Sequence, residues 1–255
     1  MGGIQSKVEK LAIGYPWVSP FVWTHFAENA MNLQRPENSR WFRGKGWCPA
    51  RRHIHICEQA LAWGASHILI VGADQIHPED MIPRLIDRVE KDNCEVITAL
   101  VPTRGHVPSM QMAPFQPMAW RFKANTVPRM YRGQALDADM VEVIDPQKGD
   151  LQRVDFIGSG VLMFPVADLL AIKKPWFAET YTPESMKRLA TMDTTFVWEL
   201  ATQAGAKCWV DTTIKVRHLN IFEIDDTYQH RFGDWEETGY GETKHEIASS
   251  EASNN

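Results

Sequence analysis

The chain has 255 residues, 44% of them hydrophobic and 23% charged, which suits a single compact globular domain with a sizeable core. Its net charge of −5 argues against general nucleic-acid binding, because that mode depends on clustered Lys and Arg that neutralise phosphates. Four cysteines without a CxxC pair exclude a zinc knuckle and a dense disulfide framework, and we expect reduced thiols in a cytoplasmic protein.

Strand-like and helix-like segments alternate in the first half of the chain. Residues 10–16 (KLAIGYP) indicate a buried strand, and residues 50–63 (ARRHIHICEQALAW) indicate an amphipathic helix. The continuous apolar run 67–74 (HILIVGAD) is typical of a buried parallel strand, followed by a helix over 77–92 and another buried strand over 94–102. This alternation predicts an α/β fold with a mostly parallel central sheet flanked by helices.

The helix over 50–63 has a predicted buried face. Ile54, Ile56, Cys57 and Leu61 recur at helical spacing, and Gly64 is placed to end the helix.

The second half begins with a segment of weak periodicity. Residues 103–149 are rich in Pro, Met and Gly, and we expect them to cover the site, with short antiparallel strands within 122–133 and 139–144. Residues 152–177 predict a strand, a Gly-Ser-Gly bend and a helix-like run that ends before Pro175.

The C-terminal third predicts a helix closed by Gly205 and a strand that ends at His218. From about Thr238 the sequence is acidic and rich in Ser and Asn, which is typical of disorder. We therefore expect one Rossmann-like domain over 1–237 and a disordered tail over 238–255. No apolar run is long enough to predict a transmembrane segment.

Three polar residues at predicted element ends are candidates for chemistry. Asp74 follows a buried strand and can ligate a divalent cation, or it can cap the next helix. Asp193 opens a helix, as a cap or as a base that takes a proton from a hydroxyl. His218 follows a strand and can ligate Mn²⁺, although a lone His is more often structural.

These segments occur in an order that resembles a known family. The sequence contains IGYP, ARRHIHICEQAL, ILIVGADQIHP, VDFIGSGVLMF, KKPWF, MDTTFVWELATQAGAKCWVD and VRHL, in that order. This series is similar to that of the GT-A glycosyltransferases, in particular compact bacterial and phage members related to glycosyltransferase family two. The resemblance extends to about Leu219 and implies a GT-A type fold.

The resemblance also implies roles for the charged residues. Asp74 matches the last acid of the DxD motif, which binds the metal and the diphosphate, and His218 matches a C-terminal His that completes the metal site. Asp193 matches the acid of an ED-x-x-F segment, the base in inverting members. Arg51 matches the Arg of an ARN segment that meets the diphosphate.

Smaller residues are matched as substrate contacts. Tyr15 and Pro16 match the end of the first strand, where the nucleotide base is held. Gly158, Ser159 and Gly160 match the bend beneath the acceptor sugar, where small residues allow the backbone to approach the ligand.

The chain departs from the family pattern at two acids. Gly72 stands where the first acid of DxD is expected, and Gln75 is a candidate for a neutral contact in its place. Met192 replaces the first acid of the ED pair. Asp137 and Asp139 form another DxD, which we interpret as a solvated turn.

The resemblance implies a metal-dependent enzyme that moves a sugar from a nucleoside diphosphate donor to a hydroxyl acceptor, with Mn²⁺ or Mg²⁺ as cofactor. The loss of the acid at Gly72 leaves open a non-catalytic sugar-nucleotide-binding protein of the same fold. A nucleotidyltransferase ranks low, because GYPWVSPF after the first strand lacks the Gly-rich basic loop expected of that class.

Overall fold

A computed structural model describes residues 7–17, 22–103, 117–124, 130–131, 134–135, 141–178, 180–181, 188–190, 192–219 and 223–224. Asp137, Asp139 and the predicted tail over 238–255 lie outside these residues, so the predictions for them stay untested. None of the helices in the described part of the chain is long and apolar enough to cross a membrane.

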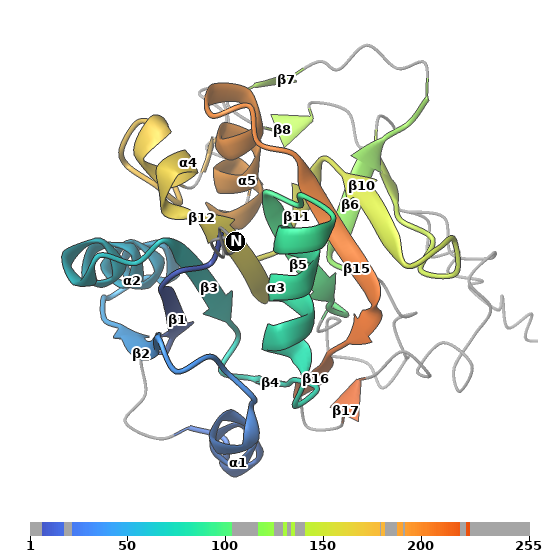
Figure 1. Cartoon of the computed structure of the whole chain (residues 1–255). Coiled ribbons are helices and arrows are strands. Elements are labelled where there is room, and N and C mark those ends of the chain that lie inside the picture. The colour runs from blue at the N-terminus through green and yellow to red at the C-terminus, as the bar shows by residue number, and fades with distance from the viewer. Residues whose placement is uncertain are drawn as a thin grey trace, which may run out of the picture.

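A seven-stranded sheet forms the centre of the molecule (Figure 1). In spatial order its strands are β10 (Leu151–Val154), β15 (Cys208–Lys215), β5 (Val96–Leu100), β12 (Val161–Pro165), β3 (His67–Val71), β1 (Leu11–Pro16) and β2 (Ser39–Gly44). Five of these strands run in one direction, and β12 and β10 run against them. The predicted α/β fold with a mostly parallel central sheet is confirmed.

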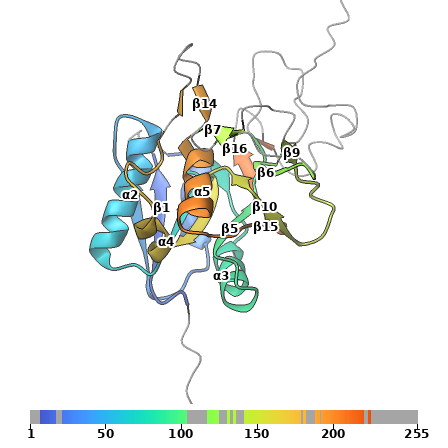
Figure 2. The ribbon, with the colours of Figure 1, turned by 90° about the horizontal axis from the view of Figure 1, so that it is seen from above.

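Helices cover both faces of this sheet (Figures 1 and 2). The core on one face includes side chains of α2 (Pro49–Trp63), α4 (Val166–Ala171) and α5 (Met192–Gln203). The core on the other face includes side chains of α1 (Thr24–Asn32) and α3 (Met81–Lys91). Strand β3 contributes side chains to both cores, because Ile68 and Ile70 pack on the first face and Leu69 and Val71 on the second.

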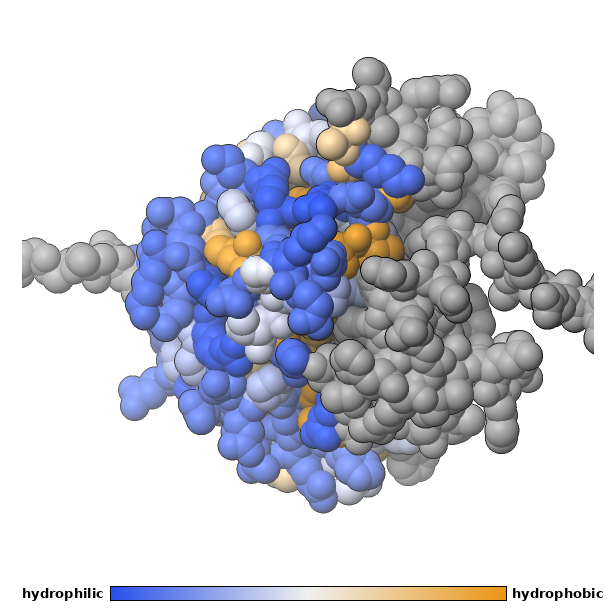
Figure 3. Space-filling model, turned by 90° about the vertical axis from the view of Figure 1, so that its right-hand side faces the viewer, coloured by the Kyte–Doolittle hydropathy of each residue, from blue (hydrophilic) through white to orange (hydrophobic). Residues whose placement is uncertain are grey.

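Short strands lie outside the central sheet. They are β4 (Gln75–Ile76), β6 (Ala119–Phe122), β7 (Met130–Tyr131), β8 (Gln134–Ala135), β9 (Val141–Val143), β11 (Phe156–Ile157), β13 (Thr180–Tyr181), β14 (Arg188–Ala190), β16 (Arg217–Leu219) and β17 (Glu223–Ile224). Strands β7 and β9 confirm the prediction of short antiparallel strands within 122–133 and 139–144, whereas β6, the partner of β9, lies almost entirely before the first of these segments. Figure 3 shows one side of the molecule, where the described surface is mainly hydrophilic.

Helix α2 begins and ends where its sequence predicts. Cys48 is its N-cap, with Pro49 in the first turn, and Gly64 ends it in the left-handed conformation at φ 74°. Its buried residues are His53, Ile56, Cys57 and Ala60. The buried face of α2 therefore differs in part from the predicted one. Ile54 and Leu61 are only partly buried, while His53 is buried in spite of its polarity.

The helix-like run predicted after the Gly-Ser-Gly bend was partly wrong. Residues 161–165 form β12, which lies between β3 and β5 and is buried on both faces, and only residues 166–171 form a helix. A short, fully buried apolar run has no period that distinguishes strand from helix, so sequence alone could not assign it.

Candidate active site

Two turns meet at the edge where the parallel strands end. Strand β3 ends at Val71, which pairs with Val161 at the start of the antiparallel β12. The Gly72 N–H donates to the Gly160 carbonyl over 2.6 Å, so the Gly158–Gly160 bend is fixed beside the end of β3. Asp74 follows directly, at the predicted position for ligand binding in an open α/β sheet.

Asp74 and His218 face one another at this edge. His218 Nε2 lies 3.5 Å from Asp74 Oδ2, and the two side chains are only 8% and 16% exposed. Backbone contacts hold them together, since the Leu219 N–H donates to the Asp74 carbonyl over 2.7 Å and β16 pairs with β4. The structure thus brings together two residues that are far apart in the sequence.

The tautomer of His218 is fixed by its other ring nitrogen. Nδ1 lies 2.9 Å from the carbonyl oxygen of Pro102, which can only accept, so Nδ1 carries the proton in the neutral ring. Nε2 then directs its lone pair towards the Asp74 carboxylate. An imidazole nitrogen oriented by a backbone carbonyl, next to a carboxylate oxygen, is a donor pair that suits Mn²⁺.

Two side chains, those of Asp74 and His218, are placed to bind a metal ion together. Among the described residues no group of three or more His, Cys, Asp or Glu side chains is placed to hold a metal ion. Asp74 and His218 would supply the protein ligands, and phosphate oxygens or water would complete the coordination, as is usual where a cation binds together with a phosphorylated ligand.

Gln75 fills the space in front of Gly72 and Gly160. A Cβ on Gly72 would lie 2.7 Å from Gln75 Cδ, and a Cβ on Gly160 would lie 2.3 Å from Gln75 Nε2. The Gln75 side chain is buried, and its Oε1 lies 3.2 Å from His77 Nε2. Gln75 therefore supports the site from within and is not exposed to a ligand, contrary to the contact suggested from the sequence.

The Gly158–Gly160 bend is packed by the chain's own side chains. A Cβ on Gly158 would lie 2.2 Å from Met118 Cε, just as one on Gly160 would meet Gln75. The small residues serve internal packing here, which corrects the expectation that they leave room for a ligand to approach the backbone at these two glycines.

Asp193 is bound to the same bend. Its Oδ2 accepts from the Ser159 N–H over 3.0 Å, with Ser159 Oγ at 3.5 Å, and its Oδ1 accepts from the Thr194 N–H over 3.1 Å. Asp193 thus satisfies backbone donors at the start of α5 and lies beside the turn that borders Asp74. Its interpretation as a base stays a prediction.

Arg51 points along α2. Its Nη1 lies 2.9 Å from Glu58 Oε1, two helical turns further on, and this hydrogen bond and the charge of Glu58 raise the pKa of Arg51. Both side chains are about 40% exposed, so the ion pair is weak and can exchange for a phosphate. The structure does not place the guanidinium beside Asp74.

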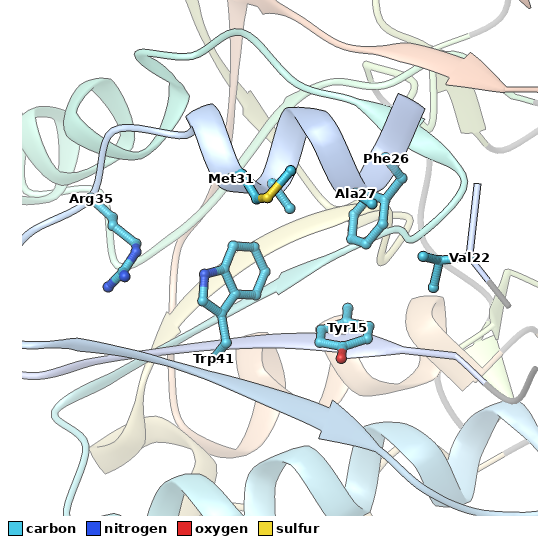
Figure 4. A pocket seen from close by; sticks show the side chains of 8 residues that line it. Tyr15, Val22, Phe26, Ala27, Met31, Arg35 and Trp41 are labelled. Atoms are coloured by element: carbon cyan, nitrogen blue, oxygen red, sulfur yellow. The ribbon is translucent and has the colours of Figure 1, made fainter. Parts of the chain in front are cut away.

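Tyr15 turns away from the strand end to which the sequence assigns a base. Its ring contacts Phe26 and Trp41, with centroid distances of 6.0 and 6.1 Å, and lines a groove below α1 (Figure 4). Pro16 is the last residue of β1 and pairs with Gly44.

Comparison of the sequence with protein-family models and with curated proteins finds no match. Three solved structures are similar in fold. A197 from STIV has a TM-score of 0.49 at 10% identity, covering 83% of this chain and 86% of that one. TarS 1-349 from S. aureus has a TM-score of 0.44 at 13% identity, covering 80% of this chain and 58% of that one. GalNAc-T7 with UDP, GalNAc and Mn²⁺ has a TM-score of 0.48 at 11% identity, covering 84% of this chain and 43% of that one.

The GT-A-like fold expected from the motifs is in line with these similarities. At identities near 10% and TM-scores below 0.5, they assign neither an activity nor a residue role to this chain. The chain spans 58% of the TarS fragment and 43% of GalNAc-T7.

Sequence reasoning missed a polar network behind Asp74. Asn29 on α1 accepts from the His77 N–H and donates to the His77 carbonyl, each over 2.7 Å, and His77 in turn contacts Gln75. Burial, with the nearby His218 as a smaller cause, lowers the pKa of His77 to about 3, so the ring is neutral. The signal was present in the sequence as three polar residues, at 74, 75 and 77, after an apolar strand.

His53 is a second residue that the sequence did not single out. It is 3% exposed in the first turns of α2, its Nδ1 lies 2.9 Å from the Pro49 carbonyl oxygen, and its ring packs on Phe177 at 4.8 Å. Burial lowers the pKa of His53, while the charge of Asp193 acts in the opposite direction. His53 is thus a neutral histidine within the electrostatic field of Asp193.

Proposed function

We propose that this chain transfers a sugar from a nucleoside diphosphate donor to a hydroxyl acceptor with the help of Mn²⁺ or Mg²⁺. The observation that carries the proposal is the Asp74–His218 pair, with Nε2 and Oδ2 3.5 Å apart and the His218 tautomer fixed by Pro102. An imidazole ligand favours Mn²⁺ over Mg²⁺, which prefers oxygen.

Each residue of the site has a distinct task in this proposal. Asp74 and His218 would hold a divalent cation, and that cation would supply positive charge for the diphosphate of the donor. Arg51 exchanges Glu58 for a phosphate oxygen, and Pro16, the last residue of β1, borders the base.

Asp193 accepts the proton of the acceptor hydroxyl if the reaction inverts the sugar. The Ser159 N–H and the Thr194 N–H hold its carboxylate in a fixed orientation, and such preorganisation is what a general base requires. Of the Gly158–Gly160 bend, Ser159, whose N–H binds Asp193, is the residue that borders the acceptor in this proposal.

The test is a turnover assay over a panel of nucleoside diphosphate sugars with and without Mn²⁺. We expect Asp74→Asn and His218→Gln each to lower metal-dependent turnover at least 100-fold, because each removes one of two protein ligands. Asp87→Asn on α3, which replaces an exposed acid, and His25→Gln on α1, which replaces an exposed histidine, are matched controls that keep full turnover. Unchanged metal dependence in both site variants would contradict the metal assignment.

The second candidate is a sugar-nucleotide-binding protein without catalysis, favoured by Gly72, which lacks the first acid of DxD. Calorimetry with the same donors separates the two functions. Metal-dependent binding without hydrolysis or transfer, over a broad acceptor panel, would favour the binding protein. In an inverting enzyme Asp193→Asn binds the donor normally and loses 10²- to 10⁴-fold in turnover.

A further inference from the structure

A groove of about 490 Å³ lies between α1 and the neighbouring strands β1 and β2, of which β2 is at the edge of the sheet (Figure 4). Its walls combine rings, aliphatic side chains and a single charged group. The residues that line it are Tyr15, Val22, Phe26, Ala27, Ala30, Met31, Arg35 and Trp41. This volume is within the range of small-molecule sites.

The lining is apolar along the groove and cationic at one end. Figure 4 shows the rings of Tyr15 and Trp41 below α1, Met31 above Trp41, and Arg35 beyond the Trp41 end. None of the eight lining residues is an acid. Met31 is 78% exposed, so much of its side chain is open to contact with a ligand in the groove.

Arg35 is positioned as an anchor for an anion. Its Nη1 donates to Ser39 Oγ over 3.0 Å, and the Ser39 carbonyl lies 3.4 Å from the same nitrogen. These contacts use one of three guanidinium nitrogens and fix its position at the start of β2. A guanidinium has five N–H donors, so most of them remain for a carboxylate or phosphate.

The groove is separate from the Asp74–His218 pair. Phe26 stands between the two, with its ring centroid 6.0 Å from that of Tyr15 on the groove side and 6.5 Å from that of His77 on the other. Arg35 contacts Ser39, the first residue of β2, and so lies near the opposite end of the parallel strands from Asp74, which follows the carboxyl end of β3. A charged group held by Arg35 is therefore remote from the candidate active site.

We propose that this groove binds an amphipathic anion, with a carboxylate or phosphate head on Arg35 and an extended apolar chain along Trp41, Met31 and Tyr15 towards Val22. The elongated lining and the single cation at one end fit a chain with one charged head. The chain covers the exposed face of Met31 and removes apolar surface from water, at about 25 cal/mol per Å². This site does not depend on the proposed glycosyl transfer.

The test is calorimetry of the full chain with four probes below their micellar concentrations. They are dodecanoate, dodecyl phosphate, dodecyltrimethylammonium and 1-naphthoate. We expect one or both dodecyl anions to bind at least tenfold more tightly than the dodecyl cation and the short planar anion. The stronger of the two anions identifies the head group as carboxylate or phosphate.

Two surface variants locate the probe. Arg35→Gln and Met31→Glu each weaken binding of the dodecyl anion at least tenfold, and both replace exposed side chains, so the fold is retained. Arg40→Gln is the matched control, because Arg40 lies on the same strand as Trp41 but over the Phe42 ring, on the opposite face. The proposal is overturned by the absence of anion binding, by tighter binding of 1-naphthoate or the cation, or by equal affinity in all variants.

Discussion

Gln75 occupies the space in front of two glycines, and this side chain explains why an acid is missing at position 72. A Cβ on Gly72 or Gly160 would come within 2.7 Å of its amide, which is buried and in contact with His77. An Asp at position 72 would displace Gln75 before it reached a ligand. The glycine at position 72, which departs from the DxD pattern, is therefore required by the buried side chain of Gln75, which packs beside Asp74.

Gly160→Ala tests this packing. We expect the added methyl to lower the free energy of unfolding by about 1–3 kcal/mol, the usual cost of overpacking a rigid core. In the double variant with Gln75→Ala, the clash with Nε2 is relieved, so the two changes together cost less than their sum. Denaturant unfolding of the four proteins measures the coupling, and strict additivity would show that Gln75 does not restrict this position.

Residues at strand ends were the easiest part of the site to predict. Asp74 follows a strand whose continuous apolar run is clear, and this position predicts that it lies at the carboxyl end of the sheet, while position alone left open whether it ligates a cation or caps the next helix. Asn29 and His77 were missed because their burial depends on each other across 48 residues of sequence. A buried polar side chain is stable only with its partners, and no local pattern names a partner at that distance.

At the scale of elements, α3 and β15 are joined by a buried ion pair. Asp211 is 1% exposed, and its Oδ2 accepts from Arg88 Nε over 2.7 Å while Oδ1 accepts from the Thr213 N–H over 2.9 Å. Burial alone would raise the pKa of Asp211, but the hydrogen bonds from Thr213 and Arg88 outweigh it and hold the pKa below its usual value.

This pair predicts a pH-dependent stability. A carboxyl group with a lowered pKa stabilises the fold above the pKa of the unfolded chain, near 4, and this contribution is lost as the pH falls through the lower pKa of the folded state. Asp211→Asn should lower the free energy of unfolding by about 1–3 kcal/mol at pH 7, since it removes the charge that accepts from Arg88 Nε and leaves only the half-exposed Asp92 as an ion-pair partner of Arg88.

Unfolding of Asp211→Asn and of the wild-type chain from pH 7 to pH 3 checks this prediction. The difference between the two proteins should shrink as the pH drops below 4. Asp87→Asn, which removes an exposed acid from the same helix, is the control and should change stability by less than about 0.5 kcal/mol. A difference that is independent of pH would show that the Asp211 charge does not contribute.

The elements themselves were predictable where a period or a cap defines them. Helices α2 and α5 follow from amphipathic spacing and a closing glycine, with Gly64 at φ 74° and Gly205 at φ 73°. Strand β12 was not predictable, because its five residues are buried on both faces and lack alternation. The face of α2 was misassigned because a buried His53 gives no apolar signal.

At the scale of the whole molecule, the candidate site is assembled from separate parts of the chain. Asp74 follows β3, Pro102 follows β5, Ser159 precedes β12, Asp193 opens α5 and His218 lies in β16. Contacts between these parts are long-range, so the unfolded chain cannot present them together. The order of the motifs predicted which segments of the chain contribute to the candidate site. The distances between their side chains follow only from the fold.

A ligand of this site therefore stabilises the entire fold. Because it binds only the folded chain, Mn²⁺ with a nucleoside diphosphate at 100 times its dissociation constant should raise the free energy of unfolding by about 2.7 kcal/mol. For a chain of this length that corresponds to a rise in Tm of about 5–10 °C.

His218→Gln should lose most of this stabilisation, because the cation then has one protein ligand, while His25→Gln, an exposed histidine on α1, should keep it in full. Thermal unfolding with the metal alone, the nucleotide alone and both together separates a ternary site from two independent ones. In the proposed site Asp74 and His218 would bind the diphosphate through the cation, so the combined effect of metal and nucleotide should exceed the sum of the separate effects. Equal stabilisation of the wild type and of His218→Gln would place the nucleotide elsewhere on the molecule.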